Sequence, residues 1–412
     1  MTETTSANPL SLGTDYETLA NRFRPIFREI SAGTVEREKT RALPHEQIAW
    51  LKQAGFGAVR VPTQYGGAGA SISQLFELLI ELAEADSNIV QALRAHFAFV
   101  EDRLNAPPSA DRDQWFARFV EGDLVGNGWT EVGSVKLGDV ITKVTGTGDR
   151  LLLNGTKYYS TGSIFADWID VYAQRADTGA DVIAVVDARH PGVRHSDDWG
   201  GFGQRTTGSG TSVYDNVPLP AEHVIPFEER FKYQTAFYQL VLLAVLAGIG
   251  RAVERDIARE VRDRKRVFSH GNAGSVSEDA QIQQVVGQIA AQVYAAQAAT
   301  LRSAEPLQRA YVARFSNDAQ VEKAANIDAE IETAKAQVIV SQLILSAATD
   351  LFNALGASGV SVSKALDRHW RNARTAASHN PLVYKARIVG DWHINGTEPP
   401  YVWQIGSGQG KA

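Results

Sequence analysis

The chain has 412 residues, of which 44% are hydrophobic and 21% are charged, and this composition predicts a globular protein with two or three layers of buried core. It contains no cysteine, which excludes disulfide frameworks, thiolate metal sites and cysteine nucleophiles, and which fits a reducing cytoplasm. The net charge of −6 is spread without blocks, which argues against nucleic acid as a partner because phosphate backbones bind to concentrated basic surfaces.

The first thirteen residues have neither a basic segment nor an apolar run, so they are interpreted as a frayed tail rather than a signal peptide. The longest apolar run, from Leu240 to Ile249, falls well short of the roughly 20 residues that span a bilayer. It is interpreted as a buried helix, and we expect a cytoplasmic protein without a membrane partner.

Apolar residues recur every three or four positions from about Tyr16 to Phe119, which predicts helices. The segment from Pro62 to Ala70 interrupts them, because its glycines and proline favour a tight irregular turn. Residues 1–122 are therefore expected to form an N-terminal α-helical domain.

Short runs rich in β-branched and aromatic residues follow, separated by Gly, Asp and Pro. The expected strands lie in VITKVTGT, LLLNGTKYYST, WIDVYAQR, DVIAVVDA and TSVYDNVPL. These runs predict a middle β-barrel domain over residues 123–227.

The spacing of apolar residues returns to that of helices from Glu228 onward. Long helices are expected near 230–265, 277–303 and 326–355, with a shorter one near 363–377. Residues 228–412 are thus expected to form a C-terminal four-helix bundle, which makes the fold class α+β.

Three segments of the chain resemble the acyl-CoA dehydrogenase superfamily, and the similarity extends over nearly the whole sequence. They are the turn PTQYGGAGA, the segment LNGTKYYSTG and the segment FGQRTTGSGTSVYDNVPLP. Within the superfamily the chain is most similar to the dibenzothiophene monooxygenase branch, through SDDWGGFGQRTTGSG and HWRNARTAASHNPLVYK. The resemblance implies an acyl-CoA dehydrogenase-like fold that holds a flavin between the β-domain and the C-terminal helices.

The resemblance also implies which residues contact the flavin. Thr161 would place its hydroxyl and backbone amide near the flavin N5 as a donor, although threonine is also a common strand filler. Trp199 corresponds to a tryptophan that packs on the isoalloxazine, and its alternative interpretation is a core tryptophan. Arg266 and Phe268 correspond to an element that reaches the flavin from a neighbouring subunit. The complete set of expected flavin contacts is Trp129, Thr130, Tyr159, Thr161, Trp199, Arg266, Phe268, Gly356, Ala357 and Ser358.

Two of the segments expected to contact the flavin are the flavin loop and a turn of small residues. The flavin loop of the family usually reads Thr-Glu-Pro before further small residues and Gly-Ser, whereas here it is shorter and Val132 stands in place of the proline. The small residues Gly356 to Gly359 resemble a turn that lets backbone amides approach the cofactor phosphate.

A carboxylate base is missing at both positions where acyl-CoA dehydrogenases carry one. The first position corresponds to the stretch Thr375–Asn380, which has no Glu, and the second corresponds to Tyr238 and Gln239. The first stretch instead carries His379, as in the monooxygenase branch, and an imidazole with a pKa near 6.5 exchanges protons at neutral pH. His379 is the first candidate for catalysis, although Ala376 replaces a second histidine of that branch.

Three other polar residues have competing interpretations. His96 aligns with a histidine bordering the active site of the relatives, but a lone histidine on an amphipathic helix is more often structural. Arg94 could bind an anionic substrate, and solvation is the preferred interpretation. His369 is expected to pack at a helix end, and without cysteine or paired histidines no metal site is expected.

Taken together, the resemblance predicts a two-component flavin-dependent monooxygenase. Reduced FMN from a separate NAD(P)H:flavin reductase would react with O2, and the C4a-hydroperoxide would oxygenate a small organic substrate. Sulfur in a thiophene, sulfoxide, sulfone or sulfinate is the preferred acceptor. The absence of a Gly-x-Gly-x-x-Gly fingerprint agrees with reduction on another protein. Superfamily members are typically tetramers with shared cofactor sites, so a homotetramer is expected.

Three alternatives to this function stay open. The first is an amine or amino-sugar N-hydroxylase of the same fold. The second is an acyl-CoA dehydrogenase with FAD and a displaced base, and the third is a non-catalytic flavin-binding protein.

Overall fold

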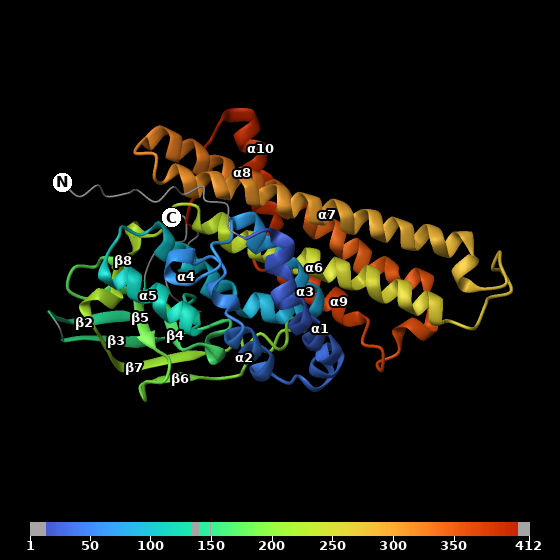
Figure 1. The fold of residues 1–412 in the computed structure, drawn as a ribbon, viewed down its shortest axis with the longest axis horizontal. Coiled ribbons are helices and arrows are strands. Elements are labelled where there is room, and N and C mark those ends of the chain that lie inside the picture. Colours follow the sequence, from blue (N-terminus) through green and yellow to red (C-terminus); the bar gives the residue numbers. More distant parts are fainter. Residues whose placement is uncertain (1–13, 133–139, 149, 403–412) are drawn as a thin grey trace, which may run out of the picture.

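The computed structural model describes residues 14–132, 140–148 and 150–402. Helices at both ends of the chain enclose a middle segment of strands, and the sheet lies at one end of a long helical bundle (Figure 1). The expected order of helical, β and helical segments is confirmed. The N-terminal residues for which a frayed tail was expected lie outside the described residues.

Five helices form the N-terminal part, and their apolar faces pack around buried aromatic rings such as Phe23, Phe56 and Phe97. A tight turn at Pro62–Ala70 separates the second helix from the third, as its sequence predicts. Gly66 in this turn has a φ of 92°, which favours glycine. The helices are α1 (Tyr16–Thr40), α2 (His45–Gln53), α3 (Ile72–Ala92), α4 (Arg94–Asn105) and α5 (Ala110–Glu121).

Helix α3 is kinked at Asp86, whose φ of −158° and ψ of 107° are not helical. The Asp86 carboxylate accepts the backbone N–H of Asn88 over 3.1 Å and therefore caps the second half of the helix. Arg37 neutralises this buried carboxylate at 2.8 Å. The kink presents the side chains of Ser87 and Asn88 to the β-domain, where they hold a loop described below.

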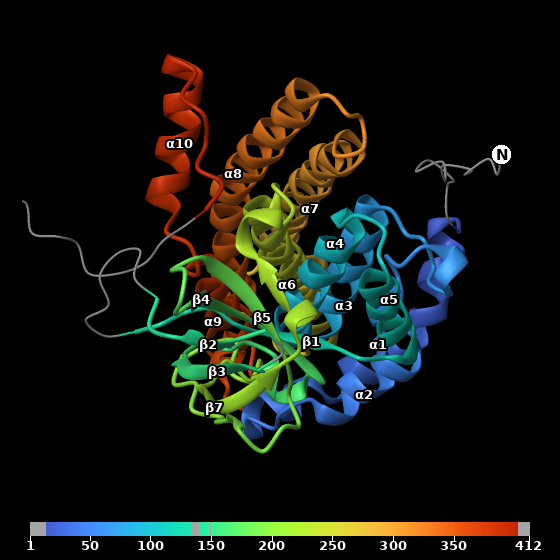
Figure 2. The same cartoon turned by 90° about the vertical axis from the view of Figure 1, so that its left-hand side faces the viewer.

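The described residues of the middle segment form one sheet of eight strands in the order β6-β7-β3-β2-β4-β5-β8, with β1 paired in parallel to β4. Figure 2 shows how this sheet curls. Alternate residues such as Val144, Leu153 and Val171 fill its core. The five expected strands are present; β1, β6 and β8 were not predicted because three or four residues are too short to show alternation. The strands are β1 (Val125–Gly128), β2 (Lys143–Thr147), β3 (Arg150–Lys157), β4 (Trp168–Arg175), β5 (Asp181–Asp187), β6 (Val193–His195), β7 (Ser212–Leu219) and β8 (Val224–Pro226).

The C-terminal part contains the four expected helices and one more. These are α6 (Gln234–Asp263), α7 (Ala280–Ala313), α8 (Ala319–Asp350), α9 (Asp367–Ala377) and the additional α10 (Leu382–Asn395). Helix α10 packs against α8 but buries only Lys385 and Ile388. Its sequence therefore lacks the apolar stripe by which a helix is usually predicted.

Helix α6 is the central helix of the bundle and contacts α3, α7, α8 and α9. It is the one described helix that is long and apolar enough to cross a membrane, but 89% of its most apolar window is buried inside the protein. The expected buried helix around Leu240–Ile249 is therefore confirmed.

Candidate functional site

Three side chains, two from helices and one from a loop, meet near the start of α6. Nη2 of Arg94, the first residue of α4, lies 3.0 Å from Nε2 of His379 in the loop between α9 and α10. The Arg94 guanidinium also lies 5.2 Å from the ring centre of Tyr238 in the second turn of α6. We refer to these three residues as the Arg94 cluster.

The sheet borders the Arg94 cluster through Trp129, which follows β1. The Trp129 ring centre lies 5.7 Å from that of Tyr238, and its Nε1 donates a hydrogen bond to Asp170 over 2.8 Å. The carbonyl of Thr130 accepts the backbone N–H of Tyr158 over 2.8 Å, which ties this segment to the end of β3. Trp129 and Thr130 thus lie where the β-domain meets the C-terminal helices.

Tyr159 and Trp199 form a partly exposed aromatic pair on the β-domain. Tyr159 has a left-handed φ of 56° and is 53% exposed. Its ring centre lies 5.9 Å from that of Trp199, with the two planes nearly perpendicular. Nε1 of Trp199 donates to the carbonyl of Gly203 over 3.1 Å, so the indole is held by its own loop. The pair offers the flat apolar surface that an aromatic cofactor needs.

Thr161 begins a chain of buried hydroxyl groups with a defined direction. Thr207 donates its only hydroxyl proton to the carbonyl of Gln204 over 3.0 Å. With Thr207 donating to Gln204, Ser209 donates to Thr207 over 2.7 Å, and Thr161 can donate to Ser209 over 2.8 Å or to the carbonyl of Tyr159 over 3.3 Å. The proton of Thr161 Oγ1 is used inside the protein, and its lone pairs remain free to accept a hydrogen bond.

This direction changes the expected role of Thr161. Its backbone amide already donates to the carbonyl of Tyr159 over 2.8 Å. In the described conformation the amide proton and the hydroxyl proton of Thr161 are both used within the protein, so Thr161 faces a ligand as an acceptor, whereas the sequence led us to expect a donor. The sequence does not reveal this, because the direction is set by Thr207 and Ser209, 46 and 48 residues further along the chain.

The loop that carries Thr207 and Ser209 is held by both helical parts. The backbone N–H of Gln204 donates to Oδ1 of Asn372 on α9 over 2.6 Å. The Gln204 side chain donates to Ser87 over 3.0 Å, and the N–H of Thr206 donates to Asn88 over 3.2 Å, both at the kink of α3. The hydroxyl chain is therefore fixed relative to α3 and α9.

His379 is a neutral imidazole in this environment. A guanidinium only donates, so Nε2 of His379 accepts from Arg94 and its proton lies on Nδ1. Desolvation and the nearby charge of Arg94 lower the pKa of His379 to about 3. The imidazole is therefore uncharged at neutral pH.

Arg94 is not solvated, contrary to the expectation from the sequence. Its side chain belongs to a helix in which every residue is buried, and Arg94 itself is 9% exposed. Burial lowers the pKa of Arg94 to about 10, so the group stays charged at neutral pH. Nothing in the sequence signals this burial, because α4 also carries polar residues such as Glu101 and Asp102 that are buried as well.

His96 is placed as a structural residue. Its Nδ1 accepts the backbone N–H of Val125 over 3.2 Å, and its Nε2 lies 2.9 Å from the carbonyl oxygen of Gly57. The ring is 1% exposed, and desolvation lowers its pKa to about 4. Both nitrogens are used by the backbone, so the structure favours a role in joining α4 to β1 over the chemical role considered from the sequence.

His369 lies in the helical bundle, away from the Arg94 cluster. Its Nε2 is 3.0 Å from Oδ2 of Asp256, and Arg368 binds the same carboxylate at 2.5 Å. This buried arrangement matches the expected packing role.

The residues expected to meet the flavin phosphate lie far from the Arg94 cluster within one chain. Arg266 and Phe268 follow the C-terminal end of α6, whereas Tyr238 lies near its beginning. At a rise of 1.5 Å per residue, these ends of α6 are roughly 37 Å apart. Figure 1 shows the loop after α6 at the end of the bundle opposite to the sheet.

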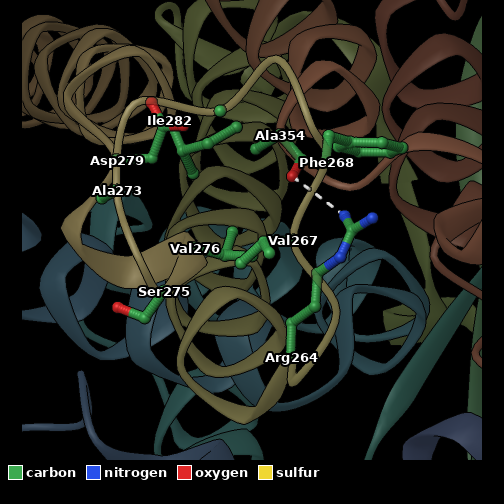
Figure 3. Close-up of a pocket in the computed structure, with 10 residues that line it drawn as sticks. Arg264, Val267, Phe268, Ala273, Ser275, Val276, Asp279, Ile282 and Ala354 are labelled. Carbon is green, nitrogen blue, oxygen red and sulfur yellow. Dashed lines mark hydrogen bonds between the residues drawn. The ribbon is translucent and has the colours of Figure 1, made fainter.

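That distant end has its own arrangement, drawn in Figure 3. Phe268, 62% exposed, covers Gly356: a Cβ at this glycine would lie 3.3 Å from Cζ of Phe268. The Arg264 guanidinium lies 4.9 Å from the Phe268 ring centre and reaches the carbonyl of Ala354 (Figure 3). The adjoining cavity of about 40 Å³ is too small for a flavin.

The other expected contacts at this end are solvent-exposed. Arg266, Ala357 and Ser358 have exposed side chains. Together with Phe268 they form an outward-facing surface, which we call the bundle tip. One chain therefore brings Thr161, Trp199 and His379 to its β-domain end and Arg266, Phe268 and Gly356–Ser358 to the bundle tip.

The carboxylates near the Arg94 cluster are engaged elsewhere. Asp170 binds Trp129 and also Arg230, at 2.8 Å. Glu131 accepts the backbone N–H groups of Ile141 and Thr142 and binds Lys157 at 2.8 Å. Gly133 and Ser134 of the expected flavin loop lie outside the described residues. Among the described residues, no Asp or Glu contacts the Arg94 cluster, as the empty base positions predict.

Comparison with known proteins supports the acyl-CoA dehydrogenase-like fold expected from the sequence. The acyl-CoA dehydrogenase N-terminal domain family matches residues 15–123, and the C-terminal domain family matches residues 240–383. A dibenzothiophene monooxygenase from Mycolicibacterium goodii is 26% identical over 393 residues, covering 91% of this chain and 93% of the relative. A probable FMNH2-dependent monooxygenase, SfnC from Pseudomonas putida, is 24% identical over 383 residues, covering 91% and 94%.

A solved structure shares the whole architecture. FMN-bound TdsC from Paenibacillus sp. A11-2 superposes with a TM-score of 0.85 at 25% identity, covering 93% of this chain and 98% of the other. The two domain families and this superposition confirm the expected fold. The chain therefore belongs to the acyl-CoA dehydrogenase superfamily.

Proposed function

We propose that this protein is a flavin-dependent monooxygenase that uses reduced FMN and O2 to oxygenate a small organic substrate at sulfur. The observation that carries the proposal is the composition of the site. It combines a hydroxyl acceptor at Thr161, a neutral imidazole at His379 and no contacting carboxylate among the described residues. The relatives named for dibenzothiophene oxidation and FMNH2 dependence support the same activity.

The residues present fit FMN. The proton of Thr161 Oγ1 is held within the protein, which leaves this oxygen as an acceptor beside the aromatic surface of Tyr159 and Trp199. The hydroxyl group suits the N5–H group of a reduced flavin, which is a hydrogen-bond donor. When bound, reduced FMN supplies the electrons that activate O2 for transfer of one oxygen atom.

The protein manages protons and water around that chemistry. Trp129, Tyr159 and Trp199 provide apolar walls that limit the access of water. The neutral imidazole of His379 can donate from Nδ1–H, whereas its Nε2 accepts the hydrogen bond of Arg94. An acyl-CoA dehydrogenase would instead need a carboxylate aimed at the substrate α-carbon.

A complete cofactor site needs two copies of the chain in this proposal. The bundle tip offers Arg266 for a phosphate and Phe268 for a ring edge, but roughly 37 Å separates it from the Arg94 cluster of the same chain. A tip from a second copy would supply these groups, in agreement with the homotetramer expected from the superfamily. A separate NAD(P)H:flavin reductase would supply the reduced FMN.

The test is a product screen with isotopic oxygen. The protein is combined with FMN, a flavin reductase, NADH and ¹⁸O2, and sulfur and amine substrates are analysed by mass spectrometry. One labelled oxygen atom in a sulfur product supports the proposal, and labelling only of amines would make the protein an N-oxygenase. Flavin bleaching by an acyl-CoA panel with an FAD-loaded protein would show a dehydrogenase. Tight flavin binding without any product would show a non-catalytic flavoprotein.

A further inference from the structure

Arg94 differs from every other buried arginine in the described part of the chain. The five others each bind a carboxylate: Arg37 binds Asp86, Arg60 binds Glu101, Arg103 binds Asp102, Arg230 binds Asp170 and Arg368 binds Asp256. Arg94 is 9% exposed and has no carboxylate among the described residues within ion-pair distance. Its described partners are the neutral ring of His379 and the face of Tyr238.

A buried guanidinium such as that of Arg94 is unfavourable for the folded protein unless an anion binds to it. Removing a guanidinium from water without a counter-ion destabilises the folded protein, which is why buried charges are normally paired. The neighbouring groups do not compensate. His379 carries no charge at neutral pH, and the buried hydroxyl of Tyr238 has no hydrogen-bond partner. The cluster therefore contains a cation and one donor without a partner among the described residues, the hydroxyl of Tyr238, while the imidazole of His379 is hydrogen-bonded to the side chain of Asn380.

The cluster also lies beside the proposed flavin site. Tyr238 contacts Trp129, and a Cβ at Gly162, next to Thr161, would meet the backbone of Ala92, two residues before Arg94. An anion bound to Arg94 would thus be held near the hydroxyl chain and beside His379. The flavin phosphate is a poor candidate for this anion, because the basic residues suited to it are at the bundle tip.

We propose that Arg94 binds an anionic group of the substrate, of the sulfinate or carboxylate class, and so selects anionic over neutral substrates. The inference rests on the proposed function, because it assigns the substrate class of the same site. Arg94 is a binding residue in this scheme, and His379 remains the residue that exchanges protons.

The experiment compares the wild type with Arg94→Met and Arg94→Lys in the presence of FMN. Methanesulfonate and benzoate serve as anions that the proposed reaction does not consume, and dimethyl sulfone serves as a neutral analogue. Binding is measured by calorimetry, without turnover. Arg302→Met is the matched control, since Arg302 on α7 is 75% exposed. We expect Arg94→Met to weaken binding of the best anion by about 10- to 100-fold, the range for a charge-assisted hydrogen bond.

Each other result has a definite meaning. Arg94→Lys should keep part of the affinity for the anions. The affinity for the neutral analogue, dimethyl sulfone, should not change in any variant. Thermal unfolding of Arg94→Met should occur at the wild-type temperature or above, since an unpaired buried charge is removed. The proposal is overturned if the wild type binds neither anion, or if Arg94→Met binds them equally well. A loss of FMN affinity with unchanged anion binding also overturns it, and assigns Arg94 to the flavin phosphate.

Turnover separates this inference from the proposed function. With alkanesulfinates as substrates, Arg94→Met should raise KM by the same factor, whereas KM for neutral sulfur substrates should not rise by that factor. If no substrate is oxygenated but methanesulfonate binds through Arg94, the anion site stands and the monooxygenase proposal fails. If oxygenation occurs and Arg94→Met treats anionic and neutral substrates alike, the monooxygenase proposal stands and the anion site fails.

Discussion

Oγ1 of Thr161 lies 2.8 Å from Oγ of Ser209 and can also donate to the carbonyl of Tyr159 over 3.3 Å, so its proton is held within the protein. Thr161 is therefore fixed as an acceptor toward any ligand. A reduced flavin carries a proton on N5 and an oxidised flavin does not, so the hydroxyl chain should favour the reduced form.

Ser209→Ala should weaken this preference. Without Ser209, the hydroxyl of Thr161 keeps only the longer hydrogen bond to the carbonyl of Tyr159, at 3.3 Å, so its proton can turn outward more readily. We expect affinity for reduced FMN to fall about fivefold, corresponding to a hydrogen bond of about 1 kcal/mol, while affinity for oxidised FMN is unchanged. Anaerobic fluorescence titration measures both. Ser209→Thr keeps the hydroxyl and serves as the control; an equal loss for both redox forms would contradict the assigned direction.

His379→Gln should affect turnover rather than cofactor binding. Glutamine can accept the hydrogen bond of Arg94 but cannot exchange a proton, so kcat should fall by about 100-fold or more. Steady-state oxygenation assays and FMN titration measure the two effects. His393→Gln, at an exposed position on α10, is the control. Unchanged kcat in His379→Gln would remove this residue from the chemistry.

The buried neutral histidines should make the fold sensitive to acid. The pKa of His96 is lowered to about 4 in the folded chain, so the unfolded chain binds an additional proton between pH 4 and about 6.5. Its contribution to stability is complete above pH 6.5 and is lost as the pH falls toward 4. His369, with a pKa lowered to about 4 by burial, acts in the same direction.

His96→Gln tests this account. A glutamine amide can donate to the carbonyl of Gly57 and accept from Val125, but it does not titrate. Urea unfolding between pH 5 and 7 should show a pH slope smaller by up to about 1.4 kcal/mol per pH unit, the value for one proton. The matched variant His393→Gln should keep the wild-type slope. An unchanged slope in His96→Gln would mean that His96 is already charged in the folded protein.

The sequence and the structure agree where a local pattern is strong. Helical spacing identified α6 to α9, and β-branched runs identified the longer strands, because burial imposes these periods directly. Helix α10 was missed since only Lys385 and Ile388 are buried on it. The environment of Arg94 was also misjudged. Charge at one position favours solvation, and only the tertiary structure shows that the whole turn around it is buried.

The site residues also divide into features that the sequence indicated and features that only the tertiary structure shows. Motif similarity singled out Thr161 and His379, which do lie at the β-domain end of the chain. It could not provide the direction of the hydroxyl chain, which depends on Ser209 and Thr207 meeting Thr161 in three dimensions. It also could not show that Arg266 lies at the other end of α6, since linear order contains no distances.

The distance of roughly 37 Å between the Arg94 cluster and the bundle tip of one chain leads to a test by subunit complementation. If the bundle tip of one copy completes the site of another, His379→Gln and Arg266→Met damage different parts of a shared site. Each variant alone should be nearly inactive, His379→Gln through kcat and Arg266→Met through FMN affinity. Co-expression of the two variants with different affinity tags, followed by tandem purification, yields mixed assemblies. When the two kinds of chain mix at random, roughly one site in four combines the intact His379 of one variant with the intact Arg266 of the other, as follows from a heterologous contact between identical subunits. We expect about a quarter of the wild-type activity at saturating substrate. Mixed assemblies no more active than the average of the two parents would show that each chain holds its cofactor alone.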